Sequence, residues 1–276
     1  MKASSTFSRN GVCIDGIKDV DIMIEKFKER SMVLMTQKNQ KYVSFYYEAM
    51  GGSQEISIDP EKTALLIVDM QNEFVHKEYG EALEFKKRGE WERWVPYFDR
   101  LHEVVIPNTK KLLKYFRDNK LQVTYGRIAC LKKDGSDRCL VQKKPGWNGM
   151  LIPINSFGAQ MVEDLQPMED EIVVNKTTDS VVAGTNYATL IRNMGIETIV
   201  VTGIVTDQCV SSTVRGLADE GFNVIVVEDC CAAATKELHD HELEIINIIY
   251  CNVMSTEETI NLLEESKREL HISSVY

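Results

Sequence analysis

The chain has 276 residues, of which 43% are hydrophobic, and it carries 32 Lys and Arg against 42 Asp and Glu. This composition supports a sizeable folded core and excludes a largely disordered chain. The formal net charge is −10 and there is no cluster of five or more Lys and Arg residues, so the chain is a poor electrostatic match for a phosphate backbone. No nucleic-acid partner is therefore expected.

Membrane and export signals are also missing from the sequence. No apolar stretch reaches the ~20 residues that a membrane-spanning helix needs, and the start, MKASSTFSRNGVCIDG, lacks the apolar segment of a secretory signal. The 7 cysteines form no C-x-x-C pair, and Cys230 and Cys231 are adjacent. That pattern is typical of reduced thiols rather than of a disulfide framework. The sequence therefore predicts a cytoplasmic protein without membrane contact.

The first 60 residues differ from the rest of the chain. Residues 20–35 have the periodicity of an amphipathic helix, and residues 41–50 fit either a helix or a strand. A Gly-Gly-Ser sequence then indicates a turn or linker. Because so short a stretch does not bury a comfortable core of its own, we expect residues 1–60 to form an arm. This arm would pack on the domain of residues 61–276 or on a neighbouring subunit.

Beyond residue 60, short apolar runs alternate with longer amphipathic segments. The apolar runs are typical of strands buried on both faces of a parallel sheet, and they cover residues 64–68, 121–125, 171–174, 198–202, 223–227 and 252–254. Helical periodicity covers residues 91–120, 185–194, 209–220, 235–250 and 256–270. Pro107 predicts a kink in the first of these helices. The alternation predicts a doubly wound α/β domain with right-handed crossovers.

Three residues at strand ends are candidates for chemistry, because ligands of such sheets bind beyond the carboxyl ends of the strands. Asp69 ends the first apolar run, Lys176 follows the third, and Cys209 begins the helix after the fourth. Each has an ordinary structural explanation when taken alone: a turn residue, a solvated cation and a small core residue. Together they would supply a base, a positive charge and a nucleophile.

The position of Cys209 predicts a reactive thiol. A helix N-terminus offers the positive end of its dipole and unpaired N–H groups, and both would lower the pKa of the thiol. The same N–H groups could stabilise a developing oxyanion.

Three sequence blocks carry these residues: TALLIVDMQNEF at 63–74, NKTTDSVVAGT at 175–185 and VTGIVTDQCVSST at 201–213. In this order the blocks resemble the isochorismatase-like cysteine hydrolases, and the resemblance covers about residues 60–268. It implies a three-layer α/β/α fold with a six-stranded parallel sheet in the order 3-2-1-4-5-6.

The resemblance also implies roles for particular residues. The catalytic triad of the family carries over to Asp69, Lys176 and Cys209. A cis peptide bond is implied between Ile204 and Val205, with an oxyanion hole formed by the N–H groups of Val205 and Cys209.

Some differences within the family can be recognised in the sequence. Nicotinamidase-like relatives bind a divalent metal through an Asp and two His after the second strand, but residues 127–147 contain no histidine. His239 and His241 are two residues apart, so on a helix they face different directions. We therefore expect no metal and no other cofactor. Siderophore-pathway isochorismatases usually lack the cysteine, so Cys209 favours cleavage of a C–N bond.

Residues 124–147 resemble relatives that act on carbamoyl, ureido or small linear amide substrates. Arg127 could hold a substrate carboxylate or ureido oxygen, or form only a surface salt bridge. Phe74 and Trp147 could line the pocket or simply pack. The mixed-charge residues 78–93 predict a solvated helix or loop near the entrance.

The prediction is a metal-independent cysteine amidohydrolase that acts on a small amide, carbamoyl or ureido substrate through a thioester-type intermediate. Three alternatives stay open: a vinyl-ether hydrolase of the isochorismatase type, a nicotinamidase-like deamidase, and a catalytically silent binding protein of the same fold. Because relatives are commonly dimers or tetramers, the resemblance implies a homodimer or a homotetramer.

Overall fold

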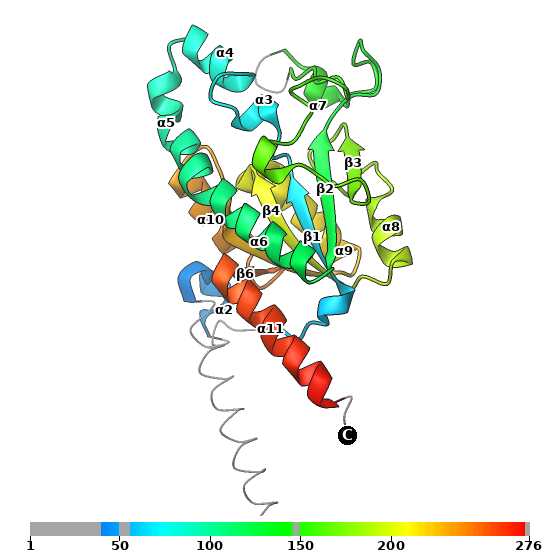
Figure 1. Cartoon of the computed structure of the whole chain (residues 1–276). Helices are drawn as coiled ribbons and strands as arrows, with labels where there is room; N and C mark the ends of the chain where they lie inside the picture. The colour runs from blue at the N-terminus through cyan, green and yellow to red at the C-terminus, as the bar shows by residue number, and fades with distance from the viewer. Residues whose placement is uncertain (1–39, 50–55, 146–148, 274–276) are drawn as a thin grey trace, which may run out of the picture.

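A computed structural model describes residues 40–49, 56–145 and 149–273, so the helix predicted at residues 20–35 lies outside the described residues. Six strands form one parallel sheet in the order β3-β2-β1-β4-β5-β6 (Figure 1). The strands are β1 Thr63–Val68, β2 Gln122–Ile128, β3 Ile172–Lys176, β4 Thr198–Ile204, β5 Asn223–Ala232 and β6 Asn252–Met254. The predicted fold and strand order are therefore confirmed.

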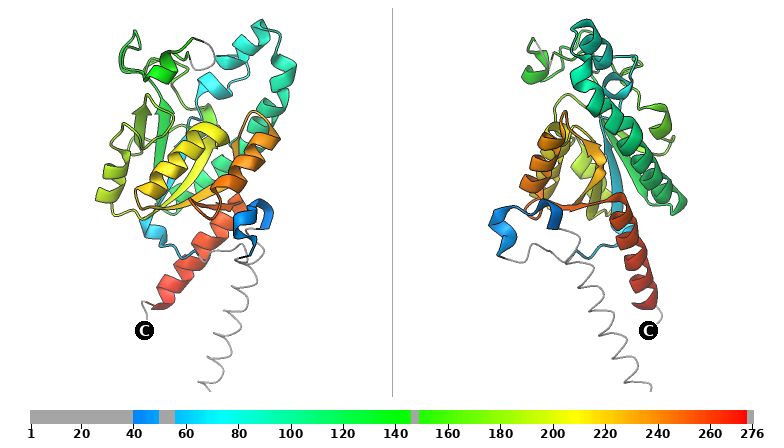
Figure 2. Two further views of the ribbon diagram at one scale, coloured as in Figure 1. Left: turned by 180° about the vertical axis from the view of Figure 1, so that it is seen from behind. Right: turned by 90° about the vertical axis from the view of Figure 1, so that its left-hand side faces the viewer.

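Helices cover both faces of this sheet, as the continuously buried strands require. All six residues of β1 and all seven of β4 are buried. Figures 1 and 2 show one helical layer on each face. One layer contains α5 Trp91–Arg100, η3 Leu101–Val105, α6 Ile106–Asp118 and α11 Thr256–Ser273; the other contains α8 Tyr187–Asn193, α9 Ser211–Asp219 and α10 Lys236–Ile246. The result is the predicted three-layer α/β/α arrangement.

Short helices occupy the connections. They are η1 Gln40–Tyr42, α2 Phe45–Glu48, η2 Pro60–Lys62, α3 Asn72–Val75, α4 Glu81–Lys87, α7 Leu140–Lys143, η4 Glu163–Leu165 and η5 Thr206–Val210. Figure 1 places α3, α4 and α7 at the carboxyl end of the sheet, while α2 and α11 lie toward the opposite end. No helix in the described ranges is long and apolar enough to cross a membrane.

The helix predicted at residues 91–120 contains a wider turn. The five residues of η3 are π-helical and lie between α5 and α6. Pro107 stands in the first turn of α6, where its missing N–H cannot donate to the carbonyl one turn earlier. The irregular turn lies directly before the proline, where this hydrogen bond cannot form. Beyond the proline the helix continues as α6.

The helix predicted at residues 235–250 ends earlier, because α10 stops at Ile246. The next residue, Asn247, is buried; its amide nitrogen donates to the carbonyl of Tyr42 at 2.9 Å, and its amide oxygen accepts the N–H of Val253 at 3.0 Å. Tyr42 lies 205 residues earlier in the chain and Val253 only six residues later, and together these partners draw the backbone out of the helix. The predicted end at residue 250 is wrong for this reason.

The turn η1 packs against the domain through Lys41 and the buried Tyr42, whereas α2 buries none of its residues. The Tyr42 hydroxyl donates to Glu228 at 2.9 Å, and Lys41 forms an ion pair with the same carboxylate at 3.0 Å. Of the two predictions for residues 41–50, the helical one agrees with η1 and α2. The domain boundary after residue 60 stays a prediction.

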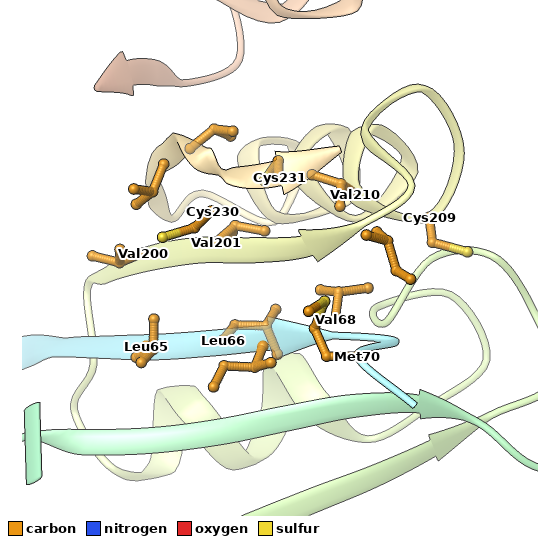
Figure 3. Close-up of a cluster of buried hydrophobic side chains, with 14 of the residues drawn as sticks. Leu65, Leu66, Val68, Met70, Val200, Val201, Cys209, Val210, Cys230 and Cys231 are labelled. Carbon is orange, nitrogen blue, oxygen red and sulfur yellow. The ribbon is translucent and has the colours of Figure 1, made fainter. Parts of the chain in front are cut away.

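Buried side chains of β1, β4 and β5 form part of the hydrophobic core. Figure 3 shows Leu65, Leu66 and Val68 of β1 near Val200 and Val201 of β4, with Cys209 beyond the strand ends. At the carboxyl end of this contact, Gly203 has a φ of 118°, and a Cβ there would lie 2.0 Å from the Val68 carbonyl oxygen. Glycine thus permits β4 to approach β1 closely, which brings together the segments that follow both strands.

Candidate active site at the carboxyl end of the sheet

Asp69 is the first residue after β1 and is 2% exposed. Its backbone N–H continues the sheet by donating to the carbonyl of Gly126 at 2.9 Å. Its φ is 53°, a left-handed conformation that Asp tolerates better than most residues. The carboxylate oxygen Oδ1 accepts the N–H of Ile128 at 3.1 Å. The carboxylate is therefore held firmly at the end of two neighbouring strands.

Lys176 is the last residue of β3, and its side chain is completely buried. Its Nζ lies 2.8 Å from Asp69 Oδ2, and it donates to the carbonyl of Thr178 at 3.1 Å and to Cys209 Sγ at 3.5 Å. A buried ammonium is tolerated only when it is paired and hydrogen-bonded. Here these three neighbours satisfy it.

Cys209 lies in η5, directly after β4, and is 6% exposed. The turn is closed by the Val205 carbonyl, which accepts the N–H groups of Gln208 at 3.1 Å and Val210 at 3.2 Å. The peptide bond between Ile204 and Val205 is cis. The three residues predicted as a triad thus meet around one lysine nitrogen; their catalytic roles and the oxyanion hole stay predictions.

A second contact fixes the cysteine-bearing turn from outside. The side chain of His239 in α10 lies 2.8 Å from Thr206 Oγ1 through Nδ1 and 3.1 Å from an Arg100 guanidinium nitrogen through Nε2. Because the guanidinium can only donate, Nε2 is the acceptor and Nδ1–H donates to Thr206. Burial, followed by the charge of Arg100, lowers the pKa of His239 to about 4. Sequence analysis missed this positioning contact.

The electrostatics of the three central residues differ from the prediction in one respect. Burial raises the pKa of Cys209 well above its usual value, and the charge of Asp69 adds to this effect, although Lys176 opposes it. Burial also raises the pKa of Asp69 against the opposing effect of Lys176. For Lys176, burial favours the neutral form, but the charges of Asp69 and Cys209 outweigh it, so its pKa is raised.

The expected lowering of the thiol pKa by a helix N-terminus is therefore wrong. Burial and the neighbouring carboxylate have the larger effect in the folded protein. The raised pKa favours the neutral form of the Cys209 thiol, which lies beside the ion pair of Asp69 and Lys176.

A cleft opens in front of Cys209. Its lining includes Asp69, Phe74, Glu81, Trp94, Tyr97, Ile128, Met150, Asp179, Ile204, Val205, Asp207, Gln208, Cys209 and Ala234. Phe74 thus lies where the sequence analysis expects a pocket wall, whereas Trp147 lies outside the described residues.

Arg127 is not among the residues that line this cleft. Its guanidinium donates to Asn175 Oδ1 at 2.7 Å and to the carbonyl of Ala159 at 3.1 Å. Successive side chains of a strand point to opposite sides, and it is the next residue, Ile128, that reaches the cleft. The structure therefore does not bring Arg127 to the triad, and neither a substrate clamp nor a surface salt bridge describes its contacts.

Three acidic side chains that sequence analysis missed line the cleft: Glu81, Asp179 and Asp207. Asp179 and Asp207 stand within the sequence blocks that carry Lys176 and Cys209, so their nearness to strand ends was a usable signal. Glu81 lies in the mixed-charge residues 78–93, which we expected to be solvated. Instead, α4 buries Ala82 and Phe85, and its first residue faces the cleft.

Burial perturbs two of these acids. It raises the pKa of Glu81 to about 8, with a further contribution from Glu73 and an opposing one from Arg88. Burial also raises the pKa of Asp207, whose Oδ1 is buried and has no hydrogen-bond partner in the described part of the chain. Asp207 thus lines the cleft with one carboxylate oxygen that has no hydrogen-bond donor among the described residues.

Within the described part of the chain, the remaining thiols and possible metal ligands give no second site. The six described cysteines are free, and Cys139 alone among them is not fully buried. Within residues 40–49, 56–145 and 149–273, no three His, Cys, Asp or Glu side chains are grouped so that they could hold a metal ion.

Comparison with known proteins places this geometry in a family. The isochorismatase domain model matches residues 63–258. The ureidoacrylate amidohydrolase of Acinetobacter baylyi is 25% identical over 221 residues, covering 78% of this chain and 89% of the relative. The N-carbamoylsarcosine amidase of an Arthrobacter species is 24% identical over 172 residues, covering 59% and 62%.

A solved structure shares the fold. A cysteine hydrolase from Pseudomonas syringae pv. phaseolicola superimposes with a TM-score of 0.64 at 23% identity, covering 77% of this chain and 97% of that one. The domain match, the strand order and these relatives agree with the resemblance seen in the sequence. The chain belongs to the isochorismatase family of hydrolases.

Proposed function

We propose that this chain is a metal-independent cysteine amidohydrolase that cleaves the C–N bond of a small amide, carbamoyl or ureido substrate. The observation that carries the proposal is the position of Lys176 Nζ, 2.8 Å from Asp69 Oδ2 and 3.5 Å from Cys209 Sγ. A base, a cation and a thiol in contact are the parts that covalent hydrolysis of an amide needs. The names of the two curated relatives, an amidohydrolase and an amidase, support the same reaction class.

In the first half of the reaction, Asp69 accepts the thiol proton as the sulfur of Cys209 attacks the carbonyl carbon. The new C–S bond pushes the carbonyl electron pair onto oxygen. The N–H groups of Val205 and Cys209 stabilise this oxyanion. Asp69 then gives the proton to the leaving nitrogen, the C–N bond breaks, and ammonia leaves from a primary amide or a terminal carbamoyl group.

In the second half, a water molecule attacks the thioester-type intermediate. Asp69 accepts a proton from this water, the C–S bond breaks, and the acid is released. The proton returns to the sulfur, so the enzyme ends in its starting state. Throughout, the ammonium of Lys176 holds the Asp69 carboxylate in place and stabilises the anionic sulfur.

The raised pKa of the Cys209 thiol fits this order of events. A permanently ionised thiolate would need no base, whereas a neutral thiol needs one within reach. Burial of all three residues also strengthens the attraction between their charges, because little water screens it.

Ammonia release from a panel of small primary amides, ureas and carbamoyl compounds tests the proposal. Replacing Cys209 by Ser or Ala should reduce kcat/KM by at least about a hundredfold. Cys139→Ser is the matched control, because this thiol is also free but lies outside the cleft, and it should keep full activity. Amide hydrolysis at a normal rate in Cys209→Ala would overturn the covalent mechanism.

Two further measurements separate this reaction from its alternatives. Release of pyruvate from isochorismate, without ammonia release from any amide, would identify a vinyl-ether hydrolase instead. Activity after exhaustive chelation should remain complete, and a loss restored by Zn²⁺ would point to a metal-dependent deamidase.

The cellular context is part of the same proposal. We expect a homodimer or homotetramer in the cytoplasm, as the resemblance implies. Light scattering of the purified chain gives its mass in solution, and a monomer at micromolar concentration would contradict the expected assembly.

A further inference from the structure

The charge of the cleft is one-sided. Glu81, Asp179 and Asp207 line it beside Cys209, and the described lining residues include no Lys, Arg or His. The buried ammonium of Lys176 does not offset these three acids, because it is already paired with Asp69 at 2.8 Å. A ligand in front of Cys209 therefore meets carboxyl groups without a protein cation among the described residues that line the cleft.

Two of these acids, Asp207 and Glu81, have surroundings that do little to stabilise a negative charge. Asp207 has a buried Oδ1 without a hydrogen-bond partner among the described residues. Glu81 is partly buried, and its surroundings favour its neutral form, because Arg88, which counteracts this effect, is itself paired with Glu90. Buried polar groups are normally hydrogen-bonded, so Asp207 Oδ1 can accept a hydrogen bond from a ligand in the cleft.

We infer that the substrate carries a positively charged nitrogen, such as an ammonium or guanidinium group, at the end remote from the scissile carbonyl. This inference rests on the proposed function and narrows its substrate class. A cation would donate to Asp207 and Glu81 and favour their ionised forms. A substrate that ends in a carboxylate would add a further negative charge to this acidic cleft and be repelled. A metal ion is a poorer occupant, because no three described ligands are grouped to hold one.

Three ureas of similar size test the preference in turnover. They are 3-aminopropylurea, which is cationic, butylurea, which is neutral, and 3-ureidopropionate, which is anionic. The wild-type kcat/KM for ammonia release should be at least about tenfold higher for the cation than for the neutral urea, and lowest for the anion.

Substitutions of the acidic residues show which of them produce the preference for the cationic urea. Glu81→Gln and Asp207→Asn should each raise KM for the cationic urea several-fold and reduce its advantage over butylurea. The matched controls are Glu92→Gln and Asp219→Asn, which remove the same charges from exposed positions outside the cleft. The controls should keep the wild-type preference, because a general effect of the acidic chain would not depend on position.

A second experiment needs no turnover, so it separates this inference from the proposed function. The full chain is treated with 2-aminoethyl or 2-sulfonatoethyl methanethiosulfonate, which are cationic and anionic reagents of similar size. The rate of modification at Cys209 is measured by peptide mass spectrometry and divided by the rate with free cysteine. The cationic reagent should have at least about a tenfold advantage, and the double variant Glu81→Gln/Asp207→Asn should lose most of it.

Equal or faster labelling by the anionic reagent would overturn the inference, even if ammonia release is normal. Preference for 3-ureidopropionate over 3-aminopropylurea would overturn it equally. Absence of ammonia release from every amide and urea, with intact preference for the cationic reagent, would instead count against the proposed hydrolysis.

Discussion

Removing the positive charge of Lys176 tests the electrostatic centre of the site. In Lys176→Met, the carboxylate of Asp69 stays buried without its partner. At a separation of 2.8 Å and an effective dielectric constant of about 20, the lost attraction is about 6 kcal/mol. Part of that attraction offsets the cost of burying both charges, so we expect a loss of about 3–5 kcal/mol in the free energy of unfolding.

Urea denaturation at pH 7.5 measures this loss. The double variant Asp69→Asn/Lys176→Met removes both charges and should recover at least about 2 kcal/mol relative to Lys176→Met. The penalty of Lys176→Met should also shrink at low pH, because protonation of Asp69 removes the uncompensated charge. Both Lys176→Met and the double variant should be inactive, because the cation or the base is gone.

Lys62 provides the matched control. It forms an ion pair with Glu197 at the same distance of 2.8 Å, but both side chains are exposed. Lys62→Met should therefore leave the stability almost unchanged. A loss in Lys176→Met no larger than that of the control, or a double variant no more stable than Lys176→Met, would refute the reasoning.

Three further predictions concern stability. His239 is neutral in the folded protein at pH 7, because its pKa is lowered from 6.5 to about 4. The free energy of unfolding of the wild type should therefore fall by up to about 3 kcal/mol as the pH drops from 6.5 to 4. Denaturation curves at several pH values should show that His239→Gln lacks this pH-dependent loss. Glu81 has its pKa raised from 4.5 to about 8, so the wild type loses stability as the pH rises across that window. The unfolding free energy of Glu81→Gln should therefore increase relative to that of the wild type over the same pH range. A difference between the two that does not change with pH would contradict the raised pKa of this carboxyl group. Gly203→Ala should destabilise the protein by more than about 2 kcal/mol, because its Cβ would lie 2.0 Å from the Val68 carbonyl oxygen. Gly195→Ala is the control: this glycine also has a positive φ but has open space around the Cβ, so the substitution should cost about 1 kcal/mol. Equal melting temperatures for the two variants would contradict the close approach of β1 and β4.

Much of the fold could be predicted from the sequence because burial leaves a local pattern. Strands buried on both faces must be apolar throughout, and this property marks β1 and β4 without any knowledge of their neighbours. The same logic placed Asp69, Lys176 and Cys209 at one edge, since the carboxyl ends of parallel strands meet there. The strand order itself came from the family resemblance rather than from periodicity.

The remaining features depend on contacts between distant residues. Asn247 ends α10 with its amide bonded to Val253 and to the distant Tyr42, and no local pattern shows the contact with Tyr42. The thiol pKa of Cys209 depends on the depth of burial and on Asp69, so the helix-terminus argument alone gave the wrong sign. Glu81 looked solvated in a charged segment, yet the fold turns it into the cleft.

The most direct test of the account is the mass of the protein during turnover. Acid quenching within milliseconds of mixing with a substrate, followed by peptide mass spectrometry, should find the acyl or carbamoyl group of that substrate on Cys209. Its formation and decay should be at least as fast as turnover, and the adduct should be absent in Cys209→Ala. Two results together would contradict the account: steady ammonia release by the wild type with no adduct on Cys209 at any time, and ammonia release by Cys209→Ala at the wild-type rate.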